Sequence, residues 1–234
     1  MPRKFELRKE VALAAAPEQV WQAIATGPGL AAWFMPMEVD PGGADVIVWD
    51  PPRRLTIRTP EAGDGPTQAF EYLVEGRDGG SAVLRFVHSG VLGEDWGAEY
   101  EAMTGHGWDM YLHTLAQYLQ HFPGLPATYV EAEAPASTAQ EDAWARLAPA
   151  LGLHDHVVTG DRVHLELDGL ASIEGVVDYV TPTFLGVRTA AALLRFHGRA
   201  AIGMPIAVSH HIYSENVDHA AVEKGWQAWL AQLS

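Results

Sequence analysis

Residues 16–34 read Ala-Pro-Glu-Gln-Val-Trp-Gln-Ala-Ile-Ala-Thr-Gly-Pro-Gly-Leu-Ala-Ala-Trp-Phe and combine a helix start, a tight turn and an aromatic pair. Pro17 suits the first position of a helix, where its missing N–H costs nothing. The glycine-proline-glycine run at 27–29 then ends that helix. After the turn the chain restarts briefly and reaches Trp33 and Phe34. The stretch therefore predicts a helix, a sharp break and a short second helix.

Strand and helix signals surround this segment in a definite order. Residues 5–13 alternate between apolar and polar side chains, which predicts a strand. Near the end of the first half, Trp108, Leu112, Leu115 and Leu119 recur at helical spacing and predict a helix with one apolar stripe. The stretches that mark the order are 5–13, 49–55 (WDPPRRL), 84–90 (LRFVHSG) and 107–119 (GWDMYLHTLAQYL).

With these landmarks in this order, residues 5–120 resemble the helix-grip (START-like, SRPBCC) superfamily, and within it the group similar to the C-terminal domain of the activator of the Hsp90 ATPase. The resemblance implies an α+β fold in which a curved antiparallel sheet wraps around a long C-terminal helix. It also implies an internal cavity of the kind that holds lipids, sterols, polyketides or plant hormones in other members.

The chain departs from this pattern after Pro41-Gly42-Gly43. Relatives continue through a further strand pair, whereas here the stretch Val46–Asp50 follows almost at once. We therefore expect one strand, or most of one, to be missing from the first sheet. The second half of the chain or a second copy of it would then supply that wall of the cavity.

Composition excludes several functional classes. The 234 residues include 15 basic and 30 acidic ones, a net charge of −15, which disfavours binding to nucleic acid or to anionic membrane surfaces. The chain has no cysteine, so disulfides, thiolate metal sites and cysteine nucleophiles are excluded. No apolar signal segment or membrane-spanning run is visible, and we expect a cytoplasmic protein without membrane insertion.

The pattern divides the chain into a helix-grip domain at 1–122, a linker at 123–137 and a second, truncated helix-grip-like unit at 138–234. In the first domain, strands are predicted at 46–49, 54–58, 69–74 and 82–88. The linker is inferred from its proline, alanine, serine and threonine content. For the second half we predict a short helix at 190–197 and a last strand at 206–213.

An internal repeat is the reason for predicting a second unit. Residues 46–59 (VIVWDPPRRLTIRT) and 176–189 (VVDYVTPTFLGVRT) match without gaps at five of fourteen positions. The pair Gly107-Trp108 recurs as Gly225-Trp226 near the C-terminus. In this interpretation the repeat lacks a counterpart of the first strand. The alternative is an unrelated α/β extension that covers an exposed sheet edge.

Aromatic side chains are the candidate lining of the cavity. Strand alternation places Phe70 and Tyr72 on one face, and Phe86 and His88 on the same face of the following strand. Rings bury much apolar area while tyrosine and tryptophan keep polar ends, which suits a small hydrophobic ligand. The full predicted lining is Trp33, Phe34, Trp49, Phe70, Tyr72, Phe86, His88, Trp108 and Tyr111. The alternative is that the same rings fill the space as a solid core.

Catalytic and metal-binding signals are weak. His88 is the titratable side chain placed near the cavity, with Glu71 and Asp109 as conceivable neighbours, but alternation sends Glu71 to the opposite face. The runs His154-Asp155-His156 and His210-His211 lack a third metal ligand at a fixed spacing. Motifs for nucleotide binding, serine hydrolysis and zinc proteolysis are missing as well, so we expect no cofactor and no metal.

Three functions remain open at this point. The first is a non-catalytic binder of a hydrophobic small molecule in the cavity. The second is a protein-interaction role resembling that of the Hsp90 activator, with a chaperone or a second copy of the chain as partner. The third is an enzyme of the polyketide cyclase/aromatase or hydrolase type that uses the same cavity.

Overall fold

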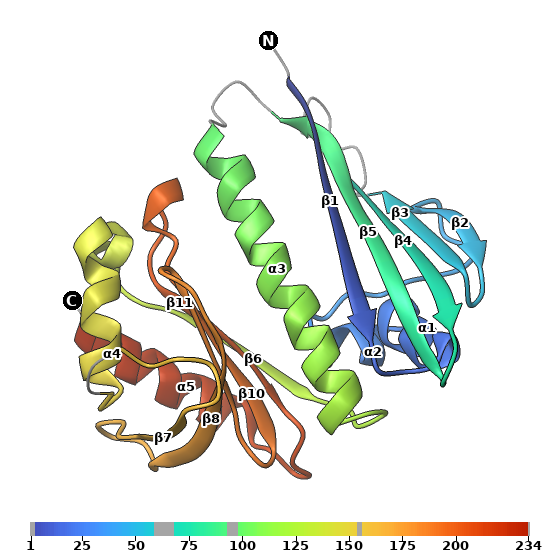
Figure 1. Cartoon of the computed structure of the whole chain (residues 1–234). Helices are drawn as coiled ribbons and strands as arrows, with labels where there is room; N and C mark the ends of the chain where they lie inside the picture. Colours follow the sequence, from blue (N-terminus) through green and yellow to red (C-terminus); the bar gives the residue numbers. More distant parts are fainter. Residues whose placement is uncertain (1–2, 59–67, 93–97, 154–155, 234) are drawn as a thin grey trace. The chain divides into compact units, whose positions relative to one another are not determined.

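The computed structural model describes residues 3–58, 68–92, 98–153 and 156–233 (Figure 1). Its contacts divide the chain into two units, Met1–Pro126 and Ala127–Ser234. The division falls inside the segment 123–137 that was predicted as a linker. Most of that segment nevertheless has a structural role, because residues Thr128–Glu133 form a strand of the second unit.

The first unit is built on an antiparallel sheet of five strands. Its order, β1-β5-β4-β3-β2, puts the first strand beside the last, and the remaining strands follow as a meander. All the strands predicted for this half are confirmed. They are β1 (Arg3–Leu13), β2 (Val46–Asp50), β3 (Arg54–Arg58), β4 (Gln68–Arg77) and β5 (Ser81–Leu92).

Helices α1 (Pro17–Ala25) and α2 (Gly27–Ala31) form as the opening stretch predicts. Thr26 lies between them and is both the C-cap of α1 and the N-cap of α2. Its hydroxyl donates to the Gln22 carbonyl at 2.8 Å and accepts the Gly29 N–H at 3.0 Å, so one side chain closes α1 and caps α2. The break between the two helices is thus fixed by hydrogen bonds.

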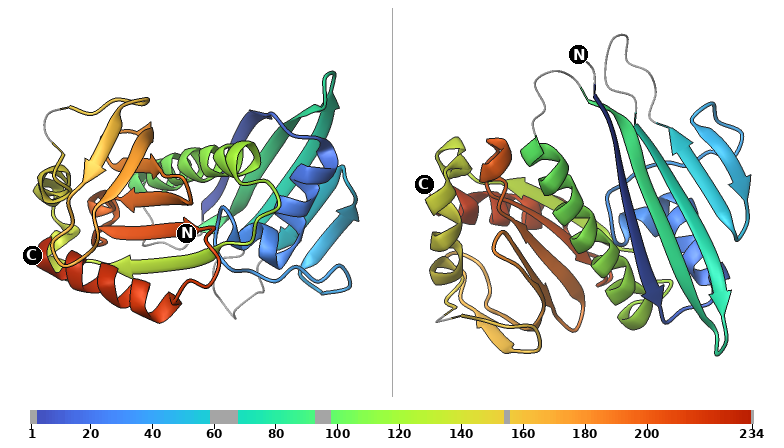
Figure 2. Two further views of the ribbon diagram at one scale, coloured as in Figure 1. Left: turned by 90° about the horizontal axis from the view of Figure 1, so that it is seen from below. Right: turned by 45° about the horizontal axis from the view of Figure 1, so that its top comes forward.

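Helix α3 (Ala98–His121) lies along one face of this sheet (Figures 1 and 2). The helix begins before the predicted stretch 107–119. Its first part is hard to predict from the sequence because Gly105 and Gly107 weaken the helical signal there. The predicted stripe of Trp108, Leu112, Leu115 and Leu119 is buried. A sheet packed against one long helix is the helix-grip arrangement expected for this unit.

The second unit also has an antiparallel sheet, with six strands in the order β6-β11-β10-β9-β8-β7. Its first strand again lies beside its last, as in the first unit. The strands are β6 (Thr128–Glu133), β7 (Arg162–Leu165), β8 (Ile173–Val180), β9 (Phe184–Arg188), β10 (Ala192–His197) and β11 (Ala207–Ile212).

Strand β6 corrects the expectation that the second unit lacks a counterpart of the first strand. It pairs with β11 over its whole length and buries Val130, Ala132 and, just after its end, Ala134. Period-two burial is therefore present. This alternation is hard to recognise in the sequence, because two of the three buried side chains are alanines and the composition of the stretch is typical of a linker.

Strand β10 corrects a second expectation, the short helix at 190–197. All six of its residues are buried, and it pairs with β9 on one side and β11 on the other. A strand covered on both faces loses the apolar/polar alternation that identifies strands in a sequence. A short apolar run of this kind is ambiguous between helix and strand.

Strand β7 has no counterpart in the first unit. It pairs with β8, whereas the described residues 32–45, which precede β2, contain no strand. The chain after Gly43 runs directly into β2, which is the last strand on its side of the sheet. That a strand is missing relative to similar proteins stays a prediction.

The longest helix of the second unit is shorter than that of the first. Helix α5 (His219–Leu230) has 12 residues against the 24 of α3. The other helical pieces are the 3-10 turns η1 (Ala136–Ala139), η2 (Glu141–Arg146), η3 (Ala200–Ile202) and η4 (Ala231–Leu233) and the single turn α4 (Leu147–Ala150). Of the two matched stretches, 46–59 includes β2 and β3, and 176–189 includes most of β8 and all of β9.

A buried ion pair crosses the second sheet. Arg195 of β10 donates from Nη1 to Asp178 Oδ1 at 3.0 Å and from Nη2 to Oδ2 at 2.8 Å, and the two side chains are 1% and 4% exposed. Gly186 of β9 makes room for the pair, because a Cβ there would lie 2.8 Å from Arg195 Nη1. The two-pronged geometry compensates both charges.

We expect Asp178→Asn to lower the free energy of unfolding by about 3–5 kcal/mol, because it leaves a guanidinium buried without its counter-charge. The matched control is Glu71→Gln, which breaks the more exposed pair of Glu71 with Arg54. That control should cost less than about 1 kcal/mol. Urea denaturation followed by circular dichroism measures both changes, and equal losses would contradict the assignment.

Candidate ligand site in the first unit

The face of the first sheet that meets α3 carries the predicted aromatic side chains. On β4, Phe70, Tyr72 and Val74 are buried, and on β5, Phe86 and His88 are buried, in strict alternation with more exposed neighbours. The alternation prediction is therefore confirmed for both strands. It follows from a sheet with one covered face.

Most of the predicted lining forms one connected set of rings. The ring of Trp108 lies 4.1 Å from Phe86, 5.1 Å from Phe34 and 5.5 Å from Phe70, measured between centroids. Tyr72 joins through Phe86 at 5.1 Å, Trp33 joins through Phe34 at 5.6 Å, and Tyr111 contacts both Phe34 and Trp108. We call this set, together with His88, the ring cluster.

Trp49 lies outside the ring cluster. It is half-buried on β2 and packs edge-on against Trp21 of α1, with centroids 5.0 Å apart. Strand β2 is the edge strand, two strands away from β4, so its side chains meet α1 and not the middle of α3. The structure thus does not bring Trp49 together with the other predicted residues.

A chain of hydrogen bonds fixes His88 inside the ring cluster. Trp108 Nε1 donates to His88 Nδ1 at 2.9 Å, and His88 Nε2 lies 3.0 Å from Gln68 Oε1. An indole N–H can only donate, so Nδ1 must accept and the imidazole proton must be on Nε2, from where it reaches the Gln68 carbonyl. His88 is held as one neutral tautomer.

Phe5 and Gln68 belong to this site although neither was predicted to line it. Phe5 of β1 meets the His88 ring edge-on at 4.9 Å, and Gln68 is the first residue of β4. Alternation along β1 already placed Phe5 on the apolar face, so that signal was present. A lone glutamine at a strand start gives no comparable signal, because its role depends on a partner twenty residues away.

The surroundings of His88 do not favour a general base. Burial lowers the pKa of His88 to about 4, and both ring nitrogens have protein partners. Glu71 points away from the cluster and pairs with Arg54 at 2.6 Å, and Asp109 pairs with Lys9 at 2.7 Å. Neither carboxylate is therefore available to orient the imidazole.

The hydroxyl of Tyr72 departs from the rule that buried polar groups are hydrogen-bonded. Its side chain is fully buried, and its hydroxyl has no hydrogen-bond partner among the residues that the structure describes. Burial also raises the pKa of Tyr72, so the group remains a neutral O–H donor. An unpartnered hydroxyl in an apolar interior costs about 1–3 kcal/mol. The site therefore offers a donor that something other than the protein would satisfy.

Trp33 takes a structural role at the rim of the cluster. It is fully buried, and its Nε1 donates to the carbonyl of Ala23 at 2.9 Å. This bond ties the segment after α2 back onto α1. The polar end of Trp33 is consequently engaged and offers nothing to a ligand.

His210 and His211 do not face a common metal ion. His210 packs on Trp226 and His211 on Tyr129, so the two rings lie on opposite faces of β11. Across the described ranges, no three histidine, aspartate or glutamate side chains gather in a way that would hold a metal ion. His154 and Asp155 lie outside the described residues.

No helix in the described part of the chain has the length and apolar character needed to cross a membrane.

Comparison with known proteins adds a likeness of fold. No family model matches the chain, and no curated protein matches it in sequence. Among solved structures, the di-domain ARO/CYC BexL from the BE-7585A biosynthetic pathway is similar over 98% of this chain and 91% of its own, at 16% identity and a TM-score of 0.45. DynU16, from the dynemicin biosynthetic locus, is similar over 97% of this chain and 96% of its own, at 19% identity and a TM-score of 0.40. The Aha1 dimer from Colwellia psychrerythraea matches 49% of this chain and 96% of its own, at 19% identity and a TM-score of 0.39.

The buried His88 makes stability depend on pH. Its folded pKa of about 4 lies below the value near 6.5 of an unfolded histidine, so the unfolded chain binds the proton first. The free energy of unfolding must then fall as pH drops from about 6.5 towards 4. We expect His88→Gln, which keeps a donor and an acceptor, to flatten this fall by up to about 1.4 kcal/mol per pH unit.

Urea denaturation at several pH values measures the slope. His197 and His210, whose pKa values are also lowered by burial, remain in both proteins and cancel in the difference. The exposed His106, replaced by glutamine, serves as the control for removing one histidine. An unchanged slope in His88→Gln would show that His88 is not held neutral.

Proposed function

We propose that the first unit binds a hydrophobic small molecule within the ring cluster, without catalysing a reaction. The observation that carries this proposal is the buried Tyr72 hydroxyl, which has no hydrogen-bond partner among the described residues. Buried polar groups in native proteins are nearly always satisfied, and an exception calls for an explanation. A ligand acceptor placed over Tyr72 supplies one.

The ring cluster defines the chemistry of such a ligand. Its aromatic faces favour a flat or ring-rich apolar body, and the Tyr72 hydroxyl favours one carbonyl or hydroxyl acceptor on that body. Phe86 and Trp108 now lie 4.1 Å apart, so binding requires these rings to separate. Sterols, flavonoids and polyketide-like aromatics have this character.

The contacts of His88 are the reason for proposing binding without catalysis. A general base needs a free nitrogen within reach of the substrate, and both nitrogens of His88 are occupied. The cyclase/aromatase alternative would require one of these bonds to break when a substrate enters. The chaperone-binding alternative rests on the resemblance of the sequence alone.

Replacing Tyr72 with phenylalanine should separate ligand binding from a purely structural role. Removal of the unpartnered hydroxyl should raise the free energy of unfolding of the ligand-free protein by about 1 kcal/mol. The same change should weaken binding of a ligand with an acceptor, because its hydrogen bond is lost. Tyr129→Phe removes a hydroxyl that is paired with Glu131 in the second unit and serves as the control.

Native mass spectrometry of the purified protein would detect a copurified ligand, and tryptophan fluorescence would follow titration with sterols, fatty acids, flavonoids and polyketide-like aromatics. A ligand whose affinity falls in Tyr72→Phe but not in Tyr129→Phe supports the proposal. Protein that carries no ligand and responds to none of these compounds would contradict it. Copurification of a chaperone would instead favour the interaction role.

A further inference from the structure

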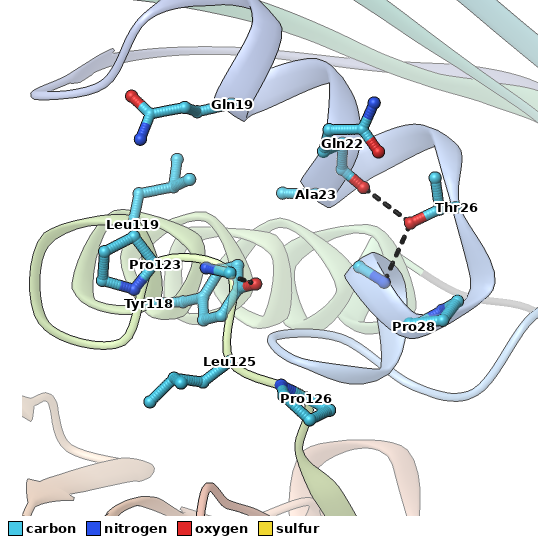
Figure 3. A pocket seen from close by; sticks show the side chains of 12 residues that line it. Gln19, Gln22, Ala23, Thr26, Pro28, Tyr118, Leu119, Pro123, Leu125 and Pro126 are labelled. Carbon is cyan, nitrogen blue, oxygen red and sulfur yellow. Dashed lines mark hydrogen bonds between the residues drawn. The ribbon is translucent and has the colours of Figure 1, made fainter.

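A hollow of the first unit lies away from the ring cluster. It has a volume of about 640 Å³ and is formed by α1, α2, the end of α3 and the turn that follows (Figure 3). This volume is in the usual range for sites that hold drug-sized ligands. Its twelve lining residues include Gln19, Gln22, Tyr118, Leu119, Leu125 and Pro126.

The walls of this hollow are held by hydrogen bonds within the protein. Tyr118 Oη accepts the N–H of Gly124 at 3.2 Å, which fixes the turn after α3 against the helix. On the opposite side Thr26 locks α1 to α2, as described above. Gly29 allows this close approach, because a Cβ there would lie 2.1 Å from the Gln22 carbonyl. The hollow is therefore preformed.

Charge is absent from the lining. Among the twelve lining residues there is no lysine, arginine, histidine, aspartate or glutamate, in a chain where 45 residues (15 basic and 30 acidic) are charged. Burial raises the pKa of Tyr118, so its phenol stays neutral. An ionised ligand would be desolvated here without a counter-charge, and a neutral ligand would not.

Two glutamine amides supply directional polarity. Gln19 and Gln22 lie three residues apart on α1, and Figure 3 shows both side chains at the hollow. The side-chain oxygen Oε1 of Gln19 accepts the Ala16 N–H at 3.0 Å, so its NH₂ group remains as a donor. The Gln22 amide has no hydrogen-bond partner within the described part of the chain and presents both a donor and an acceptor.

The apolar part of the lining lies beside these amides. Leu119 and Pro123 belong to the end of α3 and its turn, and Leu125 and Pro126 follow directly. Leu125 is 46% exposed and adds apolar surface beside the amides. A ligand with an apolar body would cover this surface while its polar edge meets the glutamines.

From these features we propose that the hollow between α1, α2 and the end of α3 binds a neutral small molecule with an apolar ring body and a lactam- or amide-like edge. The edge pairs its N–H and C=O with the Gln22 carboxamide, and the body packs on Leu119, Leu125 and the prolines. This site is separate from the ring cluster and does not depend on the function proposed for it.

The probe for this site is 2-quinolinone, a neutral lactam with an aromatic body, titrated into ¹⁵N-labelled full-length protein. We expect saturable shifts of the backbone amides of Gln22, Gly29 and Gly124. Gln22→Leu, at an exposed position, should raise the dissociation constant about threefold to tenfold, since it removes one or two neutral hydrogen bonds. Leu125→Trp should abolish binding by filling the hollow.

Three controls make the result specific. Gln120→Leu is the same substitution at an exposed position of α3 outside the lining, and it should leave the dissociation constant unchanged. Tyr72→Phe should also leave it unchanged, which distinguishes this hollow from the ring cluster. N-methyl-2-quinolinone, which lacks the N–H, should bind more weakly than the parent lactam.

Either of two outcomes would overturn the proposal. One is the absence of saturable shifts up to the solubility limit of the probe. The other is binding that Gln22→Leu and Leu125→Trp alter no more than Gln120→Leu does. Failure here would leave the ring-cluster proposal untouched, since Tyr72→Phe tests that site alone.

Discussion

The hydrogen bond from Trp108 Nε1 to His88 Nδ1 is the contact around which the first unit is arranged. A buried indole N–H must find an acceptor, and His88 supplies it from the strand next to β1. This bond ties α3 to β5 on the face where the buried stripe of the helix meets the sheet. It also fixes the imidazole as a neutral tautomer whose second nitrogen reaches Gln68. The Trp108 N–H and both ring nitrogens of His88 thus have hydrogen-bond partners. The Tyr72 hydroxyl has none among the described residues.

The two units use one strand order with different stabilising interactions. In both sheets the first strand lies beside the last, and the second sheet adds β7 next to β8. The first unit presents aromatic rings to a helix of 24 residues, whereas the second has a 12-residue helix and a buried pair of Asp178 and Arg195. The shared order accompanies the five matched positions between 46–59 and 176–189.

How far the sequence predicts the fold depends on how each strand is covered. Strands β4 and β5 were predicted because one face is buried and the other is not, which leaves a clear alternation at Phe70, Tyr72, Phe86 and His88. Strand β10 is buried on both faces and carries no such signal. Strand β6 keeps its alternation, but alanines make it resemble a linker.

The residues of the candidate sites also differ in how far the sequence predicts them. Aromatic residues of the ring cluster were predicted from type and face. Trp49 lies apart from them because it packs on Trp21 of α1, a contact that the alternation along β2 does not reveal. Gln68 could not be predicted, because a glutamine has no preferred role until its partner is known. The same holds for the unpartnered state of the Tyr72 hydroxyl and for the hollow beside Gln22, which depend on distances between segments far apart in the chain.

The most direct test of this account is the tautomeric state of His88, read from a long-range ¹H–¹⁵N spectrum of the histidine side chains at neutral pH. The account predicts a neutral ring with the proton on Nε2 and an unprotonated Nδ1 that accepts the Trp108 N–H. Assignment of the signal follows from its loss in His88→Gln. A ring protonated on Nδ1, or a charged imidazolium at neutral pH, would contradict the hydrogen bond on which the arrangement of the first unit depends.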